Sequence, residues 1–457
     1  MRTDPVTTDQ RQRQRRQPRG FGRQRLNFLA AVAATLPGVL LGVAFALHLP
    51  HPELAPPMEA LIFGVAVVGA AFILSWAAEV AQLDISAGLA IAVLALIAVL
   101  PEYAVSFVFA AEGGEAMRAS GGTSCVADGE NACSYVLANM TGSNRLLIGV
   151  GWAMVVLLAW WRFRRQGTPR GGIMLPRSSA VEITFLALAT LYSLTLPFKR
   201  TITLIDLCVL LAIFVAYTVR IARTPSGEPH LVGPAAWIGT FPVRARRAAV
   251  IGCFAFAAVV IVLSAEHFAQ GLVATGQELG INSFFLVQWL APLASEAPEL
   301  LVAGLYAWRL FVTNGLSTLV SSKVNQWTLL VGTLPLVFAI TSRSLSGLPV
   351  DDLQSKELLL TAAQSAFAVA VLLNLELSLT DALLLLGLFV AQFVVGAVVP
   401  GEHELTIVSV VYLVLAAGAL LRQRRYILPV LRDGLRTRHD RPERPDPSPA
   451  PVGPGGD

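Results

Sequence analysis

The chain has little charge for its length. Only 14% of its 457 residues are Asp, Glu, Lys or Arg, whereas a soluble domain has about 25%. So few charged side chains cannot cover the two or three soluble domains that this length would otherwise make. With 55% hydrophobic residues, the chain is also excluded from the disordered class, and the composition indicates a polytopic membrane protein.

Cysteine and catalytic motifs are equally scarce. Four cysteines in the whole chain exclude a secreted disulfide scaffold, and no Cys/His spacing suggests zinc. No nucleophile motif, HExxH or phosphate loop is present, so we expect neither an enzyme nor a cofactor. Cys125 and Cys133 share a predicted outer loop. We expect a disulfide between them, the alternative being two free thiols.

Long apolar runs dominate what is present. A helix needs about 20 mainly apolar residues to cross about 30 Å of hydrocarbon. No cleavable signal peptide is evident, because the first apolar run is long enough to span. The expected fold class is all-α, with about twelve transmembrane helices. The apolar stretches are 27–49, 58–80, 86–111, 135–161, 179–197, 201–222, 245–267, 282–311, 314–340, 357–375, 379–399 and 404–422.

Basic residues predict the orientation. Four segments, 1–26, 162–177, 220–247 and 422–457, hold 26 of the 34 Lys and Arg residues. With twelve spans and the N-terminus inside, all four lie on the cytoplasmic side, as the positive-inside rule requires. We therefore expect a multi-pass protein of the cell (inner) membrane with both termini cytoplasmic. The basic tails are expected to contact membrane lipid rather than nucleic acid.

An internal repeat runs through the apolar sequence. Pro101-Glu102 recurs 197 residues later as Pro298-Glu299, and Thr141-Gly-Ser-Asn144 is echoed by Ser322-Lys-Val-Asn325. In both copies a glycine follows the asparagine by seven residues. Five predicted spans separate the two Pro-Glu pairs, so the copies cross the membrane in opposite directions. Inverted repeats of this kind are typical of secondary transporters, whose substrate site lies at mid-depth between the halves.

The repeat divides the chain into an ordered series of parts. The oligomeric state stays open. The parts are a basic tail (1–26), an additional helix (27–49), a first five-helix repeat (58–222), a cytoplasmic linker (223–244), a second five-helix repeat (245–399), a terminal helix (404–422) and a disordered tail (423–457).

The repeated carboxylates are the candidate cation ligands. Glu102 and Glu299 are each preceded by a long apolar run, and an intramembrane carboxylate usually serves an ion or proton path. Glu296 lies on the same helical face as Glu299, so the two should not both ionise without a cation. The alternative is a buried, neutral or paired glutamate. Arg145 and Lys323 are expected near span ends, so neither matches the glutamates in depth within the membrane.

Neutral oxygens could complete such a site. Proline leaves the carbonyl four residues earlier without its helical hydrogen bond, which makes the backbone oxygens of Ile97 and Ala294 candidates. Each side-chain candidate, taken singly, could equally serve packing or interhelical hydrogen bonding instead of cation binding. These candidates are Ser295, Thr328, Ser143, Asn139, Asn144 and Asn325.

These motifs resemble those of the cation/Ca²⁺ exchanger superfamily, whose two alpha repeats have the form Gly-Thr-Ser-x-Pro-Glu followed by Gly-Ser-Asn-Ile-x-Asn or Asp. The resemblance covers roughly residues 60–160 and 250–340 and implies a core of five plus five helices. Ligand positions of the family fall on residues with oxygen-bearing side chains at Glu102, Glu299, Ser295, Ser143 and Thr328, and with a changed type at Glu296.

The same comparison shows where hydroxyl ligands are replaced. The family's first Gly-Thr-Ser is Ile97-Ala98-Val99 here, and Leu147 and Val324 also lack side-chain oxygens. A centre rich in carboxylate and poor in hydroxyl suits proton coupling or a single cation.

We therefore expect an antiporter that moves Ca²⁺ or Na⁺ in exchange for Na⁺ or H⁺ by alternating access. Glu102, Glu299 and Glu296 are the expected metal ligands, and inorganic cations the expected partners. The alternatives are a proton-coupled carrier of another solute, a membrane enzyme, or a degenerate relative that does not transport.

Overall fold

The structure is a computed structural model. It describes residues 21–84, 100–127, 129–168, 171–223, 231–398 and 403–436. The predictions for residues 1–20, 85–99, 224–230 and 437–457 lie outside the described residues.

Helices build almost all of the described chain, because in lipid a helix satisfies its own backbone polar groups. The first half contains α2 (Gly22–Ala46), α3 (Pro56–Ala81), α5 (Leu100–Ala119), α6 (Ala132–Leu146), η1 (Leu147–Trp152), α7 (Ala153–Arg165), η2 (Arg177–Ser179), α8 (Ala180–Ser193), η3 (Leu196–Phe198) and α9 (Leu204–Ile221). The second half contains α10 (Pro234–Ile238), α11 (Val243–Leu279), α12 (Ser283–Trp308), α13 (Val312–Asn325), η4 (Gln326–Leu330), α14 (Val331–Ser342), α15 (Asp352–Leu372), α16 (Leu379–Val398) and α17 (His403–Leu435).

The all-helical membrane class is confirmed. In the described part of the chain, nine helices are long and apolar enough to cross a membrane, and two shorter apolar helices accompany them. Each of the twelve predicted stretches overlaps one of the observed helices. The count of twelve spans and the repeat layout stay predictions.

Several boundaries differ from the sequence prediction. The helix that contains Glu102 continues to Ala119, and α11 continues to Leu279, because Gly280 ends it with a left-handed backbone conformation. The disordered tail predicted from residue 423 is wrong over residues 423–435, which are helical. The linker predicted at 223–244 contains the short helix α10. Helix α12 runs continuously through the second Pro-Glu pair.

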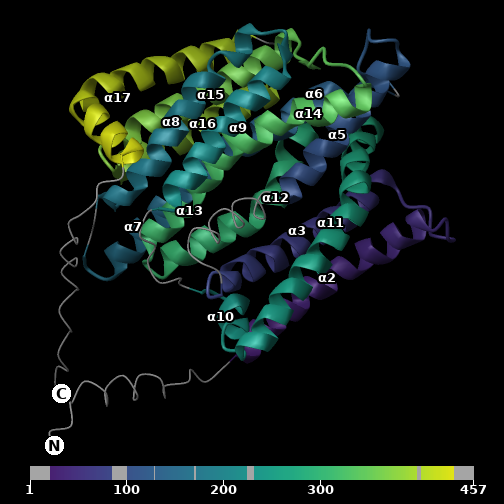
Figure 1. Cartoon of the computed structure of the whole chain (residues 1–457), viewed down its shortest axis with the longest axis horizontal. Coiled ribbons are helices and arrows are strands. Elements are labelled where there is room, and N and C mark those ends of the chain that lie inside the picture. Colours follow the sequence, from purple (N-terminus) through teal and green to yellow (C-terminus); the bar gives the residue numbers. More distant parts are fainter. Residues whose placement is uncertain are drawn as a thin grey trace, which may run out of the picture.

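The helices pack as two groups (Figure 1). Helices α2, α3, α10 and α11 lie together and share a small apolar core of their own, built around Ala66, Ile73 and Val260. The remaining helices surround a larger core. Helices α5 and α12 contact both groups, so they join the two.

Short strands tie the halves of the chain together. Strand β3 (Gly172–Met174), just before α8, pairs with β6 (Glu376–Ser378), just after α15. Strand β4 (Thr201–Ile202), just after α8, pairs with β5 (Leu348–Pro349), just before α15. The pairing is reciprocal, as two segments related by a two-fold axis would make it. Strands β1 (Val126–Ala127) and β2 (Glu130–Asn131) form a separate hairpin between α5 and α6.

A cluster of ion pairs joins the end of α3 to the start of α11. The Arg246 guanidinium donates to both carboxylate oxygens of Asp84, at 2.7 and 2.8 Å, and Arg247 donates to the same carboxylate at 3.3 Å. The hydrogen bonds from Arg246 hold the pKa of Asp84 below its ordinary value. The pair therefore stays charged at neutral pH and fastens the two helices where both leave the apolar layer.

Candidate cation site

Three carboxylates from both repeats meet inside the bundle. Glu102 lies in the first described turn of α5, whereas Glu296 and Glu299 lie one helical turn apart on α12. Glu102 and Glu296 are 2% and 3% exposed, and Glu299 is partly buried. The Glu296 carboxyl is a neighbour of both the Glu102 and the Glu299 carboxyl and interacts with each of them. The structure thus brings together the three residues that the sequence singled out.

Two side chains from the second repeat hold these carboxylates in place. The Gln326 amide, in the π-helical turn η4, donates to Glu296 Oε1 at 2.6 Å and to Glu102 Oε2 at 3.3 Å. The Ser322 hydroxyl on α13 donates to Glu299 Oε2 at 2.6 Å. Gln326 therefore connects α5 and α12 through one amide group.

Acceptor oxygens outnumber donors around this point. Of the buried oxygens that lack a hydrogen-bond donor within the described residues, four belong to these carboxylates and to side chains on the helices around them. They are Glu102 Oε1, Glu296 Oε2, Gln326 Oε1 and Asn139 Oδ1. Buried polar atoms are normally paired, and each exception in a native structure calls for an explanation. A hard cation is the partner that carboxylate and amide oxygens share.

A fully buried lysine lies beside the carboxylates. Lys323 Nζ donates to the backbone oxygen of Asn144 at 2.7 Å and to its Oδ1 at 2.6 Å. The ammonium interacts electrostatically with Glu102 and Glu296. The expectation that Lys323 lies near a span end is wrong, because α13, η4 and α14 form one long apolar helix with Lys323 well inside it. Asn144 is thus engaged by an internal cation.

A second buried charge has its own partner. Arg145 is 2% exposed, and its guanidinium lies 2.6 Å from a carboxylate oxygen of Glu357 on α15. It also lies over the Trp289 ring, 5.0 Å from the ring centroid. The expectation for Arg145 is corrected in the same way as that for Lys323. This ion pair joins α6 to α15 and leaves the three carboxylates to the candidate site.

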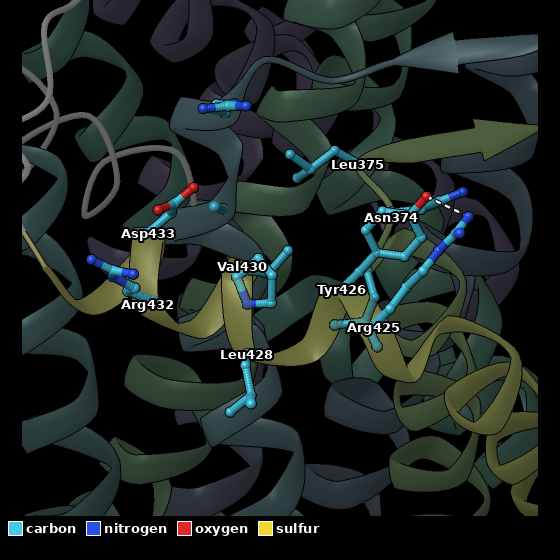
Figure 2. Close-up of a pocket in the computed structure, with 12 residues that line it drawn as sticks. Asn374, Leu375, Arg425, Tyr426, Leu428, Val430, Arg432 and Asp433 are labelled. Atoms are coloured by element: carbon cyan, nitrogen blue, oxygen red, sulfur yellow. Dashed lines mark hydrogen bonds between the residues drawn. The ribbon is translucent and has the colours of Figure 1, made fainter. Parts of the chain in front are cut away.

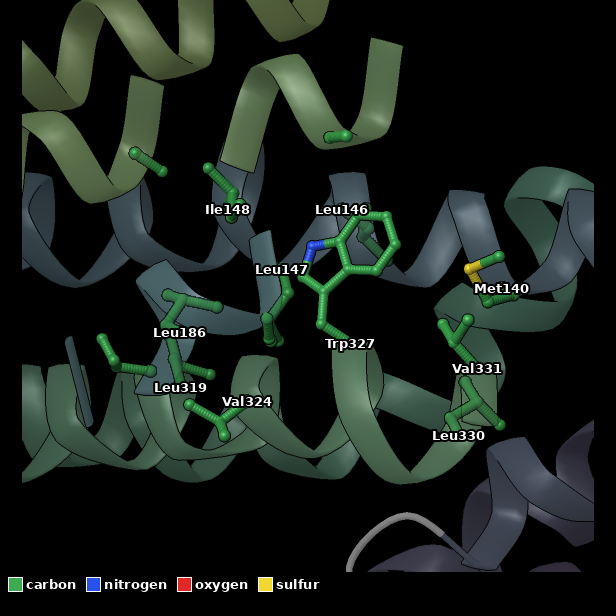
Figure 3. Packing of buried hydrophobic residues seen from close by; sticks show 14 of the residues in the cluster. Met140, Leu146, Leu147, Ile148, Leu186, Leu319, Val324, Trp327, Leu330 and Val331 are labelled. Carbon is green, nitrogen blue, oxygen red and sulfur yellow. The ribbon is translucent and has the colours of Figure 1, made fainter. Parts of the chain in front are cut away.

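π-Helical turns follow both repeated asparagines. The turn η1 begins directly after Leu146, two residues beyond Asn144, and η4 begins directly after Asn325. π-Helical turns occur mostly as local bulges at functional sites, where they re-aim side chains. In η4 the turn presents Gln326 to the carboxylates and Trp327 to the core, where the indole donates to Ser365 Oγ at 2.7 Å. Figure 3 shows Trp327 packed among apolar residues that include Leu146 and Leu147 of the other repeat.

The predicted hydroxyl ligands donate to backbone carbonyls, and Ser143 also lies beside a carboxylate. Ser143 lies beside the Glu102 carboxyl and donates its hydroxyl to the Asn139 carbonyl at 3.1 Å. Ser295 donates to carbonyls of its own helix, as does Thr328 to Val324 at 2.6 Å. These hydroxyls keep their oxygen lone pairs but are oriented by local backbone.

Three further predictions concern neutral oxygens. Asn325 is 2% exposed at the junction of α13 and η4. The side chain of Ala294 lines an apolar groove between α12, α3 and α11. Ile97 lies outside the described residues.

The outer-loop cysteines are joined. A disulfide links Cys125 and Cys133, with their Cα atoms 5.7 Å apart. It closes the β1–β2 hairpin against the start of α6.

This arrangement can bind a cation by several oxygens at once and can exchange it for protons. Glu102, Glu296 and Glu299 are neighbours, but neither they nor any other three acidic, His or Cys side chains of the described residues are spaced as a complete metal site. A bound cation would therefore draw on carboxylates together with amide and hydroxyl oxygens, which is the ligand mixture that Ca²⁺ accepts.

The sequence analysis placed Lys323 and Arg145 near span ends and did not assign Gln326, Ser322 or Glu357 to the site or its surroundings. A signal for Lys323 was present: a basic residue inside an apolar span needs an acidic partner, and the repeated glutamates are its nearest candidates. Gln326 gave no such signal, since only the π-helical turn directs it inward.

Comparison with known proteins identifies the family. The model of the family described as sodium/calcium exchanger protein matches residues 58–222 and 249–397. The chain belongs to this family. The two matched regions coincide with the two parts that carry the repeated Pro-Glu motifs.

Solved structures agree with this membership. The crystal structure of the H⁺/Ca²⁺ exchanger CAX superimposes with a TM-score of 0.80 at 39% identity, covering 90% of this chain and 98% of that one. The structure of native YfkE gives a TM-score of 0.57 at 14% identity, covering 85% of this chain and 100% of that one, and shows likeness of fold alone. No curated protein sequence matches the chain. This family member is thus a membrane-spanning transporter of the cation/Ca²⁺ antiport type.

Proposed function

We propose that this family member exchanges Ca²⁺ for H⁺ across the cell membrane by alternating access, with Glu102, Glu296 and Glu299 as the shared binding groups. The observation that carries this is the meeting of three carboxylates from α5 and α12, two of which keep a buried oxygen that has no hydrogen-bond donor within the described residues. The similarity at 39% identity to a protein titled H⁺/Ca²⁺ exchanger supports the choice of ions.

The balance of charge favours one divalent ion. Three ionised carboxylates beside the Lys323 ammonium leave two negative charges in excess, which a single Ca²⁺ would balance. When the cation leaves, the carboxylates cannot all stay ionised at such close range, so protons take its place. Cation and proton therefore compete for the same oxygens, which is the coupling that an antiporter needs.

Gln326 can serve both the protonated and the Ca²⁺-bound state of the site. With its nitrogen toward Glu102 and Glu296, the amide acts as donor, and its Oε1 has no donor of its own within the described residues. Rotation of the amide by half a turn presents Oε1 instead. The same side chain then contributes a ligand oxygen to the cation, while Ser143 and Asn139 provide further oxygens nearby.

The two packing groups supply the moving parts. Helices α2, α3, α10 and α11 have their own small core, and α12, which carries two of the carboxylates, contacts both groups. If the group of α2, α3, α10 and α11 slides against the remaining helices, the carboxylates become accessible first from one side of the membrane and then from the other. Other transporters built from repeats work in this way.

Contacts between segments far apart in the sequence support the twelve-span layout, in which both termini lie on the same side of the membrane. The β3–β6 pair and the Asp84–Arg246 pair join segments that the layout places inside. The β4–β5 pair and the hydrogen bond from Gln277 to Glu130 join segments that it places outside. No inside segment is paired with an outside one among these contacts, which is what the layout requires.

The test is ⁴⁵Ca²⁺ uptake into proteoliposomes with an imposed pH gradient, repeated with a Na⁺ gradient and with neither. We expect uptake to follow the pH gradient. Glu102→Gln and Glu299→Gln should each reduce uptake by at least about a hundredfold, because each removes a ligand charge from a low-dielectric site. Glu278→Gln, on an exposed residue at the end of α11, is the matched control and should transport as the wild type does.

The outcomes separate the competing functions. Uptake that follows only the Na⁺ gradient would keep the site and change the coupling ion. Uptake of no inorganic cation under any gradient, with no binding heat in calorimetry, would reject exchange and favour a non-transporting relative or a carrier of another solute. Full uptake in both glutamine variants would also overturn the assignment of the site.

A further inference from the structure

A basic cavity lies at the far end of the last helix, away from the three carboxylates. It has a volume of about 650 Å³ and lies between the end of α17, the start of α8 and the turn after α15 (Figure 2). Its charged lining consists of Arg177, Arg425, Arg432 and one acidic residue, Asp433. The walls between them include Leu375, Leu428 and Val430 (Figure 2). The cavity thus combines an excess of positive charge with apolar sides.

Two of the arginines are available to a ligand. Within the described residues, Arg177 and Arg432 have no hydrogen-bond or ion-pair partner, and both are exposed. Arg425 donates to the Tyr426 hydroxyl at 2.8 Å. Figure 2 shows Arg425 and Tyr426 at one end of the cavity and Arg432 with Asp433 at the other. An anion between these ends would be reached from both, and arginine is the residue that best recognises phosphate.

The walls of the cavity are fixed by hydrogen bonds to the end of α17. Thr184 on α8 donates its hydroxyl to the Val430 carbonyl at 3.2 Å. The Arg220 guanidinium on α9 donates to the carbonyls of Asp433 and Arg436 at 3.1 and 3.0 Å. The end of α17 therefore packs on α8 and α9 as part of the bundle, which makes the cavity a built feature.

The position along α17 points to lipid. The helix has 33 residues, which is about 50 Å at about 1.5 Å per residue, whereas the hydrocarbon core is about 30 Å thick. The basic residues from Arg422 onward mark the end of its apolar run. Beyond them Leu428 is 77% exposed, on the same helix as the arginines. An exposed apolar side chain among basic residues is typical of a segment that lies in the membrane interface.

We propose that this cavity binds the phosphate headgroup of an anionic phospholipid, with Arg177, Arg425 and Arg432 around the phosphate and the acyl chains lying along Leu428. The excess positive charge selects an anionic lipid over a zwitterionic one. The volume lies within the range of pockets that hold drug-sized ligands and leaves room for a glycerophosphate group. The lipid would join the end of α17 to the start of α8, which carries the buried Glu182.

Native mass spectrometry of the full, delipidated chain tests this. Protein in detergent is titrated with phosphatidylglycerol, with phosphatidylcholine and with inorganic phosphate. We expect phosphatidylglycerol to bind at least about tenfold more tightly than phosphatidylcholine, and Arg177→Ala/Arg432→Ala to remove that preference. The matched control is Arg244→Ala/Arg424→Ala, which removes two exposed arginines that do not line the cavity and should keep the preference.

The remaining outcomes decide against the site. Equal binding of the two lipids by the wild type, or the same loss in both double variants, would show nonspecific attraction to basic residues. If inorganic phosphate displaces phosphatidylglycerol from the wild type at equal concentration, the cavity is a site for a soluble anion and the lipid proposal is overturned. Should the alanine variant not fold, the wild-type melting temperature still tests the site, because only phosphatidylglycerol should raise it.

Discussion

At the scale of single residues, the site depends on a lysine that faces glutamates inside the membrane. Lys323 holds Asn144 through two hydrogen bonds and lies in the electrostatic field of Glu102 and Glu296. Charged groups at this depth are found paired or facing a cavity. When protonated, Lys323 is an internal cation that lowers the net negative charge available to the transported ion.

Removal of this charge should strengthen cation binding. We expect Lys323→Met to lower the Kd for Ca²⁺ by about tenfold or more, measured by isothermal titration calorimetry, and to slow uptake because release becomes harder. Lys323→Arg keeps the charge and should bind Ca²⁺ nearly as the wild type does. An unchanged Kd in the methionine variant would show that the ammonium does not act on the site.

The residue scale also shows how far sequence can go. Glu102, Glu296 and Glu299 could be predicted because a carboxylate inside an apolar run is costly and rare, and a repeated one is rarer still. Gln326 could not, since a glutamine in a helix carries no comparable cost and its direction is decided by a π-helical turn. Ser295 and Thr328 were predicted as ligands from their oxygen atoms, yet each hydroxyl donates to its own helix.

At the scale of elements, the close approach of α6 to α12 positions the site. Gly142 lies against the carbonyl oxygen of Gln288, and a Cβ atom at this glycine would overlap that oxygen. The contact holds α6, which carries Ser143, directly against α12, which carries Glu296. A methyl group here has to push the two helices apart, because the obstacle is backbone and cannot rotate away.

A Gly142→Ala variant should report on this contact. We expect a loss of stability of about 1–3 kcal/mol, as for other cases of overpacking, seen as a lower melting temperature, together with slower Ca²⁺ uptake. Gly387→Ala on α16 is the control, because a Cβ at that position meets open space. Equal melting temperatures for the two variants would contradict the close packing of α6 on α12.

Element positions were predicted better than element ends. Apolar runs of sufficient length identify a membrane helix from composition alone, and each predicted stretch overlaps an observed helix. The ends of α11 and α17 extend beyond the apolar runs, because helices continue into polar sequence until a residue such as Gly280 stops them. The π-helical turns have no signature in the hydrophobic pattern, since they change the register by only one residue.

At the scale of the whole molecule, the expected layout places both termini and the two long basic loops on one side of the membrane. Single cysteines at Gln166 and at Gly121, in a background with Cys208 and Cys253 replaced by serine, test this layout. We expect an impermeant maleimide added to intact cells to label Gly121→Cys but not Gln166→Cys, because one candidate span, Ala132–Arg165, separates the loops that carry them.

Permeabilised cells provide the control for that experiment, since both cysteines should then react. Labelling of Gln166→Cys in intact cells would reverse the orientation. Labelling of both positions in intact cells would place them on the same side of the membrane. The number of spans between them would then be even, and the two repeats would no longer be expected to run in opposite directions.

The reciprocal strands have a consequence for how the protein is made. Strand β3 leaves the ribosome roughly 200 residues before its partner β6. At about 5–20 residues per second, this interval lasts on the order of 10–40 s. During that time the first half is inserted in the bilayer with two of its connecting segments lacking their neighbours. Biosynthesis therefore passes through a half-built state that only the emerging second half can complete, and a chaperone or insertase has that interval in which to shield it.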